Sequence, residues 1–169
     1  MIAIACVDAK NGIGKNGQLL VSIPEDMRFF KEATNGSVVI MGRKTLYSFK
    51  DKKPLKNRIN VVLTKNTKKL AIDYEEYDNI YFVQNLTELN DICKKYYDKK
   101  IFVIGGASIY DMLIDFCDRC YITKLDKTFD ADSFFPDLEK RGFVIDNESE
   151  VQTYKGINYK YITYVKRKN

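Results

Sequence analysis

The sequence predicts an α/β fold over residues 1–169: a mostly parallel, twisted central sheet of about eight strands flanked by about four helices. Short runs rich in β-branched residues alternate with amphipathic stretches, as in parallel strands joined by crossover helices. Several runs, such as residues 37–41 and 101–104, are almost wholly apolar, which indicates burial on both faces of a sheet. The last two runs alternate polar and apolar residues around a turn at residues 154–156, so we expect an antiparallel hairpin at the C-terminal edge.

Hydrophobic periodicity gives the expected order of elements within one domain of residues 1–169. We expect strands at residues 2–7, 37–41, 60–63, 80–83, 101–104, 120–125, 142–150 and 159–166. We expect helices at residues 24–33, 44–49, 86–96 and 108–116. The first helix has the clearest start, because Ser22 and Glu25 have the spacing of a capping box and Pro24 lies in the first turn.

The composition limits the chemistry that the chain can perform. It has 28 Lys and Arg, 23 Asp and Glu, and no His, which gives a formal net charge of +5. Without His, imidazole-based catalytic pairs and His-containing metal sites are excluded, and we predict no metal site. The basic residues are interleaved with acids along the chain, so we expect no nucleic-acid partner.

The cysteines and the N-terminus indicate a reducing compartment. We expect Cys6, Cys93, Cys117 and Cys120 to be free, mostly buried thiols, because nothing completes the Cys117/Cys120 spacing to a zinc site. The N-terminus lacks a basic region ahead of its short apolar run, and no apolar run approaches the length of a membrane span. We therefore expect a cytoplasmic protein without a membrane partner.

A glycine-rich segment, residues 11–17, follows the first strand. Gly12, Gly14 and Gly17 suit either a plain surface turn or a mobile loop that approaches a ligand closely. No Gly-Lys-Ser or Gly-Lys-Thr ends the segment, and it does not open directly into a helix. Both a P-loop and a G-x-G-x-x-G dinucleotide fingerprint are therefore excluded.

Asp26 is a candidate functional residue in the first predicted helix. It lies in the first turn, with Met27 beside it and Phe30 four residues later on the same face. One interpretation is an acid that only complements the helix dipole. The other is a carboxylate in an apolar pocket, which could bind the amidine-like edge of a heterocycle through two hydrogen bonds.

Three strand ends have residues suited to phosphate. Gly42-Arg43-Lys44-Thr45 and Leu63-Thr64-Lys65 combine cations with hydroxyls, and Gly105-Gly106 precedes a helix. Each segment alone could be an ordinary turn. The carboxyl ends of parallel strands meet at one edge of a sheet, so together the segments predict a phosphate-binding site at that edge.

Taken in order, these segments resemble dihydrofolate reductase of the bacterial chromosomal type over nearly the whole chain. The matching motifs are Asn11-Gly12-Ile13-Gly14, Pro24-Glu25-Asp26, Val39-Ile40-Met41-Gly42-Arg43-Lys44-Thr45, Asn57-Arg58, Val61-Val62-Leu63-Thr64, Val103-Ile104-Gly105-Gly106, Tyr121-Ile122-Thr123 and Phe134-Phe135-Pro136. The resemblance implies NADPH-dependent reduction of 7,8-dihydrofolate to tetrahydrofolate for one-carbon metabolism. Hydride would go to pterin C6, and water would protonate N5. It also implies antifolate binding and a monomer.

The resemblance implies a role for each residue on the substrate side. Asp26 and Thr123 would form the catalytic pair, with Asp26 binding the 2-amino and N3 edge of the pterin. Arg58 would pair with the α-carboxylate of the glutamate tail. The pterin and benzoyl group would be lined by Ile4, Ala5, Met27, Phe30, Phe49, Leu55 and Ile104.

The resemblance also implies the residues that bind NADPH. The glycine loop would close over the nicotinamide, residues 105–110 would hold the pyrophosphate, and the basic strand ends would bind the adenosine phosphates. The full expected set is Cys6, Ile13, Gly14, Gly17, Gln18, Leu19, Gly42, Arg43, Lys44, Thr45, Leu63, Thr64, Lys65, Ile104, Gly105, Gly106, Ala107, Ser108, Ile109 and Tyr110.

The chain departs from the family pattern at two positions. Leu20-Val21 stands where the family carries Pro-Trp, and Ser108 stands where many relatives carry a cation. The second change leaves the 2′-phosphate to Arg43, Lys44 and Lys65. The alternatives are a pyrimidine reductase of riboflavin synthesis on the same fold, which should lack the Asp26 helix and Arg58, and a non-enzymatic module that binds anions.

Overall fold

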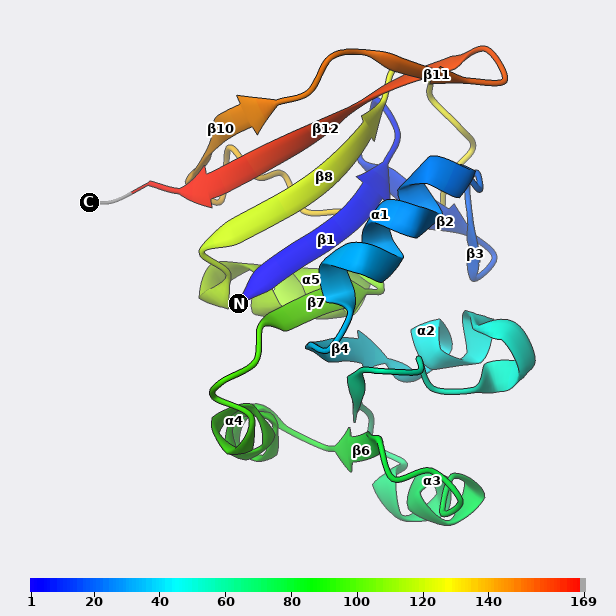
Figure 1. Ribbon diagram of the computed structural model, residues 1–169, viewed down its shortest axis with the longest axis vertical. Helices are drawn as coiled ribbons and strands as arrows, with labels where there is room; N and C mark the ends of the chain where they lie inside the picture. Colours follow the sequence, from blue (N-terminus) through cyan, green and yellow to red (C-terminus); the bar gives the residue numbers. More distant parts are fainter. Residues whose placement is uncertain (168–169) are drawn as a thin grey trace.

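The computed structural model describes residues 1–167, in which the chain alternates between strands and helices (Figure 1). The main sheet contains β1 (Ile2–Val7), β4 (Val38–Gly42), β5 (Ile59–Leu63), β6 (Ile80–Val83), β7 (Ile101–Gly105), β8 (Arg119–Leu125), β10 (Phe143–Glu148), β11 (Gln152–Tyr154) and β12 (Ile157–Lys166). The helices are α1 (Pro24–Thr34), α2 (Arg43–Ser48), α3 (Thr67–Asp73), α4 (Leu86–Lys95) and α5 (Ala107–Leu113), with 3-10 turns at Lys50–Lys52 and Ile114–Phe116. A small second sheet contains β2 (Gly12–Lys15), β3 (Gln18–Leu19) and β9 (Ser133–Phe134).

The strand order confirms the predicted fold class. The main sheet runs β10-β12-β8-β1-β7-β4-β5-β6, with β11 paired to β12. From β8 to β6 every neighbouring pair is parallel. β12 is antiparallel to β8, and β10 and β11 are antiparallel to β12. The four free cysteines are confirmed as well, with Cys6 half-buried and the other three buried.

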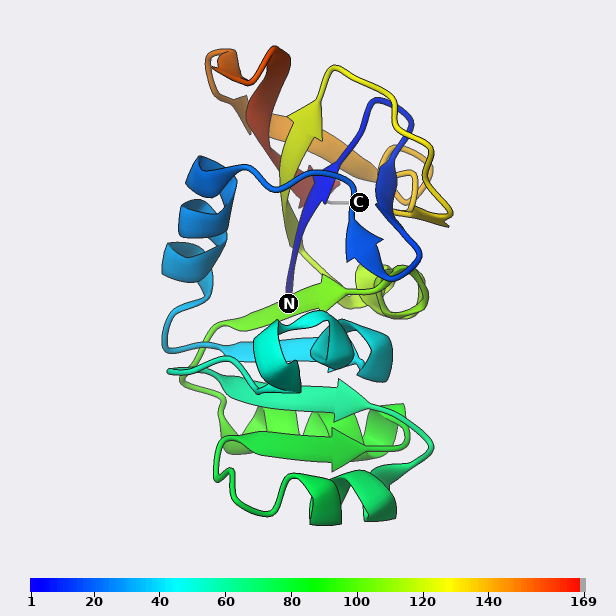
Figure 2. The same ribbon diagram turned by 90° about the vertical axis from the view of Figure 1, so that its right-hand side faces the viewer.

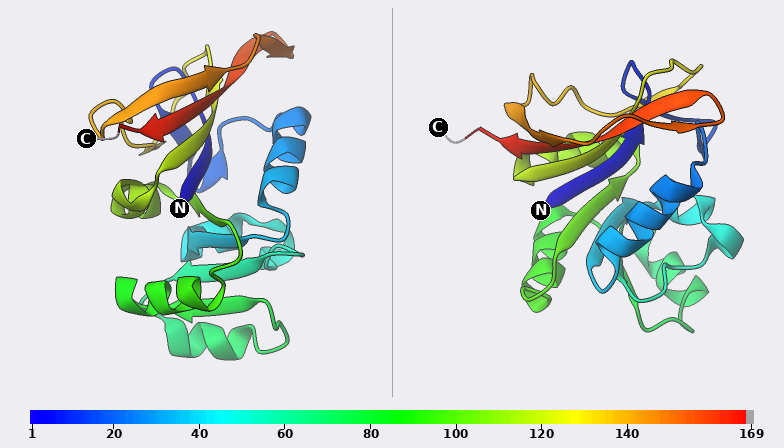
Figure 3. Two further views of the ribbon diagram at one scale, coloured as in Figure 1. Left: turned by 60° about the vertical axis from the view of Figure 1, so that its left-hand side comes forward. Right: turned by 45° about the horizontal axis from the view of Figure 1, so that its top comes forward.

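Helices cover both faces of the sheet, as Figure 3 shows with α4 and α5 on one side and α1 on the other. On the first face, Val38 and Ile40 pack with buried residues of α4 and α5. On the second, Val39 and Met41 pack with residues of α1, α2 and α3. These four residues of β4 are completely buried, because successive side chains of a strand point to opposite faces and both faces are covered.

Some local structure differs from the expectation. α3 was not among the predicted elements; it is a single short helix that buries Leu70 against the sheet. The 12–19 segment was expected as loop, and it forms the β2–β3 hairpin, which also pairs with β9. The prediction of a capping box at the start of α1 is wrong. The N-cap residue is Ile23, no side chain caps the helix, and Pro24 occupies its first turn. Ile23 is almost fully buried, so packing anchors this end of α1.

The C-terminal hairpin is more elaborate than expected. The turn at Lys155 and Gly156 exists, but it joins β12 to the short strand β11 rather than to a continuous strand over residues 142–150. β12 is long enough to pair with β11 near its start and with β10 near its end. The pairing of β10 with β12 is itself irregular, since its register shifts between Ile145 and Asn147.

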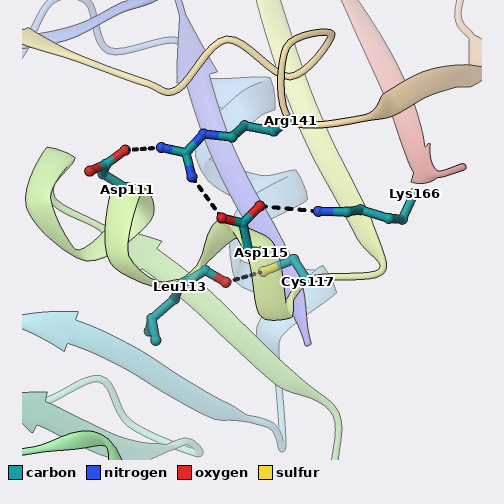
Figure 4. Close-up of polar contacts among 6 residues, drawn as sticks. All are labelled: Asp111, Leu113, Asp115, Cys117, Arg141 and Lys166. Atoms are coloured by element: carbon teal, nitrogen blue, oxygen red, sulfur yellow. Dashed lines mark hydrogen bonds and ion pairs between the residues drawn. The ribbon is translucent and has the colours of Figure 1, made fainter.

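An ion-pair cluster joins α5 and the following turn to the C-terminal edge (Figure 4). Arg141 pairs with Asp111 and donates to Asp115 at 2.8 Å, and Lys166 donates to the other oxygen of Asp115 at 3.2 Å. Beneath the cluster the Cys117 thiol donates to the carbonyl of Leu113 at 3.5 Å. The two cations lower the pKa of Asp115, so the cluster ties β12 to α5 at neutral pH. No helix within residues 1–167 has the length and apolar character of a membrane span.

Candidate active site

The three glycine-containing strand ends meet at one edge of the sheet. β4 lies between β7 and β5, and all three are parallel. Figure 2 shows their arrowheads at the same side of the molecule, with the β2–β3 hairpin near that edge. The loops that follow these strands are therefore neighbours, as the argument from parallel strands predicts.

The loops after β4 and β7 pack closely enough to form one cradle. A Cβ at Gly42 would lie 3.2 Å from Cγ1 of Ile109, and a Cβ at Gly106 would lie 3.7 Å from the Thr45 hydroxyl. The Gly105–Gly106 peptide is cis. Tyr110 is buried behind the loop and donates a hydrogen bond to the carbonyl of Ile4 at 2.6 Å. The first turns of α2 and α5 follow glycines and have no side-chain cap, so their amides stay available to an anion.

Cations border this cradle. Arg43 and Lys44 begin α2, and Lys65 follows β5; all three side chains are exposed. Within residues 1–167 none of them forms an ion pair with a carboxylate, and Arg43 stacks over the Tyr47 ring at 5.9 Å. Thr64 and Thr45 are half-buried between these cations. The arrangement offers unpaired positive charge beside open amides, which suits a phosphorylated ligand.

The remaining residues of the expected cofactor set divide between the loop and the core. Gly17, Gln18 and Leu19 are exposed at the hairpin tip, where the Leu19 side chain is 62% exposed. Ser108 is exposed on α5, whereas Ala107 and Gly14 are half-buried. Ile13 and Leu63 pack on the core that also contains Ile109. Ile104 is buried on the opposite face of the sheet, with the α1 core.

Asp26 lies next to this edge, on α1 over the sheet face. Thr123 of β8 donates a hydrogen bond to Asp26 Oδ1 at 2.5 Å. Desolvation by burial raises the pKa of the Asp26 carboxyl, and the hydrogen bond from Thr123 opposes the rise without cancelling it. The structure therefore contains a partly buried carboxylate held by a hydrogen bond from Thr123, not an exposed acid that only complements the helix dipole.

An apolar cluster lies on the same face as Asp26. Ile4, Phe30, Phe49 and Leu55, all expected to line the substrate, belong to it together with Ile104. Met27 is 46% exposed beside Asp26 on α1. The Ala5 side chain, by contrast, packs in the core on the α5 face, because neighbouring residues of β1 alternate between faces. Only its main chain can take part in a site on the Asp26 face.

Arg58 precedes β5, and the residue is 8% exposed. Its guanidinium donates to the carbonyls of Lys31 and Lys56, at 2.6 and 2.7 Å, and to the Thr34 hydroxyl at 3.1 and 3.2 Å. No carboxylate among residues 1–167 pairs with it, and desolvation by burial lowers its pKa. A buried cation whose hydrogen-bond partners are all neutral has an uncompensated charge, which favours binding of an anionic group from a ligand.

Two aspartates that the sequence reasoning missed fix the glycine hairpin. Asp8 accepts hydrogen bonds from the backbone amides of Gly12, Lys10 and Phe129 at 2.7 to 2.9 Å. Burial raises the pKa of Asp8, but these three amides together outweigh burial and leave it lowered. A Cβ at Gly12 would lie 2.9 Å from Asp8 Oδ2 and 2.6 Å from Cβ of Ala131, so only glycine fits at this position without a steric clash. The sequence signal was Asp8 at a strand end before Asn-Gly, a typical turn acceptor.

Asp132 holds the tip of the hairpin. Its Oδ2 accepts the amide of Asn16 at 2.9 Å, and the Asp132 amide donates to the carbonyl of Gly14 at 3.0 Å. The hydrogen bond from Asn16 is the main reason that the pKa of Asp132 is lowered. Because Lys15 also pairs with Asp130, the segment over residues 130–134 acts as a clasp for the hairpin.

Asp132→Ala is expected to lower turnover about fivefold, which corresponds to about 1 kcal/mol, by loosening the hairpin that we expect to close over the site. Thermal unfolding should change little, because Asp132 lies at an exposed turn. Steady-state kinetics with thermal melts check this, and Asp146→Ala on β10, an exposed aspartate far from the hairpin, is the control. Equal turnover in the wild type and Asp132→Ala would show that the clasp does not govern closure.

A mostly parallel sheet whose glycine-containing strand ends meet at one edge is the architecture of an α/β enzyme that binds a dinucleotide. Comparison with known proteins agrees. The family model described as dihydrofolate reductase matches residues 1–166. The dihydrofolate reductase of Bacillus subtilis (strain 168) is 33% identical over 166 residues, covering 97% of this chain and 93% of that protein. The dihydrofolate reductase of Heliothis virescens is 33% identical over 181 residues, covering 98% of this chain and 96% of that protein.

A solved structure is similar over the same length. Dihydrofolate reductase from Enterococcus faecalis, complexed with NADP(H) and RAB-propyl, superposes with a TM-score of 0.83 at 29% identity, covering 99% of this chain and 96% of that one. The chain belongs to the dihydrofolate reductase family.

Proposed function

We infer that this protein reduces 7,8-dihydrofolate to 5,6,7,8-tetrahydrofolate with NADPH, the reaction that supplies reduced folate to one-carbon metabolism. The observation that supports this most strongly is the pairing of two half-sites at one edge: a partly buried, hydrogen-bonded carboxylate at Asp26 and a glycine cradle bordered by exposed cations. The pyrimidine reductase alternative is not favoured, since the family match spans residues 1–166 and both Asp26 and Arg58 are present.

On the substrate side, we propose that Asp26 accepts hydrogen bonds from the 2-amino and N3 edge of the pterin. Thr123 would fix the carboxylate by donating to Oδ1, which leaves the other oxygen to face a ligand. Asp26 would orient and polarise the ring, and water would supply the proton to N5, because a carboxylate bound to the pyrimidine edge cannot reach N5. The apolar cluster of Ile4, Phe30, Phe49 and Leu55 would enclose the ring and benzoyl group.

The tail of the substrate would reach Arg58. The guanidinium already has three neutral acceptors that hold its plane, and an α-carboxylate would supply the missing negative charge. This interaction gives binding energy away from the reacting atoms and so favours folates over pterins that lack the glutamate.

The cradle fits NADPH, which supplies the hydride when bound. Gly105, Gly106 and the first residues of α5 would meet the pyrophosphate through main-chain amides, where no side chain obstructs a close approach. Arg43, Lys44, Thr45, Thr64 and Lys65 would bind the adenosine phosphates. The hairpin of β2 and β3, with exposed Gln18 and Leu19, would exclude water from the reacting atoms.

Loss of NADPH absorbance on addition of dihydrofolate tests the proposed function. We expect rapid loss that an antifolate inhibits, and no loss with the pyrimidine substrate of the riboflavin-synthesis reductase. NADPH oxidation with the pyrimidine but not with dihydrofolate would replace the proposed function by the alternative.

Arg43→Ala combined with Lys65→Ala is expected to weaken NADPH binding about 30-fold while changing NADH binding by less than about threefold. The reason is that both cations are assigned to the 2′-phosphate, which NADH lacks. Fluorescence titration with both cofactors measures the two constants. Lys94→Ala with Lys100→Ala, which removes the same charge at the far α4 end, is the control. Equal losses for NADPH and NADH would show that the 2′-phosphate lies elsewhere.

We further propose that the protein acts as a monomer in the cytoplasm, with residues 1–169 as one domain and dihydrofolate and antifolates as its small-molecule ligands. The family membership and the absence of a membrane-spanning helix within residues 1–167 support this.

A further inference from the structure

The segment that leads into β5 has no strand partner of its own. Residues 53–58 form neither helix nor strand, yet they include Leu55, which we expect to line the substrate, and Arg58, which we assign to the glutamate tail. The main-chain polar groups of such a segment need hydrogen-bond partners outside a regular element wherever they are removed from water. Here two asparagine side chains, those of Asn60 and Asn79, supply them.

Asn60 is the second residue of β5 and is fully buried. Its side chain pairs with both main-chain polar groups of Leu55: Oδ1 accepts from the amide at 3.0 Å, and Nδ2 donates to the carbonyl at 3.0 Å. The same Nδ2 lies 3.3 Å from the carbonyl of Arg58 and 3.2 Å from that of Asn79. Because Nδ2 has two hydrogens for three acceptors, a second donor is needed to hold the segment firmly.

Asn79 is that second donor. It immediately precedes β6, the strand next to β5 at the edge of the sheet. Its Nδ2 donates to the carbonyl of Leu55 at 3.0 Å and to the carbonyl of Arg58 at 3.1 Å, with one hydrogen for each. Its own carbonyl accepts the Asn60 amide at 2.8 Å, which fixes Asn79 on β5. One half-buried side chain therefore joins the two points of the segment that carry substrate residues.

We propose that Asn79 is a positioning residue for the substrate: by holding the carbonyls of Leu55 and Arg58, it fixes the separation between the apolar wall and the guanidinium that receives the tail carboxylate. This inference rests on the proposed role of Arg58 and extends it to a residue that acts only through the segment it holds. Preorganisation of this kind raises the affinity for folates, because the segment does not have to be ordered when the tail binds.

Steady-state kinetics with dihydrofolate and with a dihydropterin that lacks the glutamate tail test the proposal. Asn79→Ala should raise KM for dihydrofolate about fivefold or more, with kcat and KM for the dihydropterin changed by less than about twofold. Asn79→Leu restores the bulk of the side chain without its donors, so it should behave like the Ala variant. Asn90→Ala, which alters an exposed asparagine of α4, is the control and should change neither KM.

A double-mutant comparison shows whether Asn79 acts through Arg58. Arg58→Lys already removes the two parallel N–H groups that would bind the tail carboxylate. Asn79→Ala added to Arg58→Lys should therefore raise KM for dihydrofolate by less than about twofold beyond the single Arg58 variant. The same fivefold increase in both backgrounds, equal increases for both substrates, or a wild-type KM in Asn79→Leu would each overturn the proposal.

Hydrogen exchange in the protein without ligand gives a readout that is independent of the reaction. In Asn79→Ala the amide of Leu55 should exchange about threefold faster or more, because the segment opens more often, while the amide of Val61 inside β5 keeps its wild-type rate. An unchanged Leu55 rate would overturn the proposal. If Arg58→Lys left KM for dihydrofolate unchanged, the proposed role of Arg58 would fail, but the Leu55 rate would still decide whether Asn79 holds the segment.

Discussion

Asp26→Asn is expected to reduce turnover with dihydrofolate about 100-fold or more, while the dissociation constant of NADPH changes by less than about twofold. The amide keeps the shape of the carboxylate and can still accept from Thr123, but it removes the negative charge that would hold and polarise the pterin edge. The cofactor cradle lies on other loops and does not contact this side chain. Stopped-flow turnover and NADPH titration measure the two effects.

The same substitution should make the protein more stable at neutral pH. The pKa of Asp26 is raised in the folded state, mainly by desolvation, so the folded protein binds this proton more tightly than the unfolded chain does. The stability that the protonated group contributes is present below the ordinary Asp pKa and is lost as pH rises through the folded-state pKa. Asn has no charge at any pH and so does not lose this stability as pH rises. The melting temperature of Asp26→Asn should therefore exceed that of the wild type at pH 7, and the two temperatures should converge at about pH 4.

Glu25→Gln is the matched control, since it removes one exposed carboxylate from the adjacent position. It should leave turnover and the pH dependence of melting unchanged. Wild-type turnover in Asp26→Asn would remove Asp26 from the active site, and a lower melting temperature at pH 7 would show that its charge is not costly in the fold.

Arg58→Lys is expected to raise KM for dihydrofolate about 30-fold or more, and to leave KM for a dihydropterin without the glutamate tail unchanged. Lys keeps the positive charge but cannot present two parallel N–H groups to a carboxylate. It also cannot keep the contacts with Thr34 and the carbonyls of Lys31 and Lys56 that hold the guanidinium plane. Steady-state kinetics with the two substrates separate tail binding from ring binding.

Because Arg58 also connects α1 to the start of β5, some loss of stability is expected, and melting curves of the variant must accompany the kinetics. Arg28→Lys, which alters an exposed arginine of α1, is the control and should change neither KM. Equal increases of KM for both substrates would mean that Arg58 acts on the fold or the ring pocket and not on the tail.

The parallel sheet could be predicted because buried strands such as β4 and β7 are apolar at nearly every position. The meeting of their glycine-containing ends followed from parallel topology alone. The short elements could not be predicted in the same way. β2 and β3 depend on pairing with each other and with β9, more than 110 residues later, where Gly12 partners Phe134. α3 is a seven-residue helix held mainly by Leu70, too short for a clear periodic signal.

Local patterns also misled where tertiary contacts decide the outcome. Ser22 and Glu25 have the spacing of a capping box, yet burial of Ile23 sets the start of α1. Ala5 is adjacent to Ile4 in sequence, but strand alternation puts their side chains in different cores. Asp8 was overlooked because its partners include Phe129, far along the chain, and only the folded structure brings the two together.

The most direct test of the central claim is a single turnover with NADPH that carries deuterium at its transferable C4 position. If the Asp26 pocket and the Gly105–Gly106 cradle serve one reaction, one deuterium should appear at C6 of tetrahydrofolate for each NADPH oxidised, and Asp26→Asn should slow that transfer without weakening NADPH binding. NADPH that binds but leaves dihydrofolate without deuterium, or label found elsewhere in the product, would contradict the assignment of this site to dihydrofolate reduction.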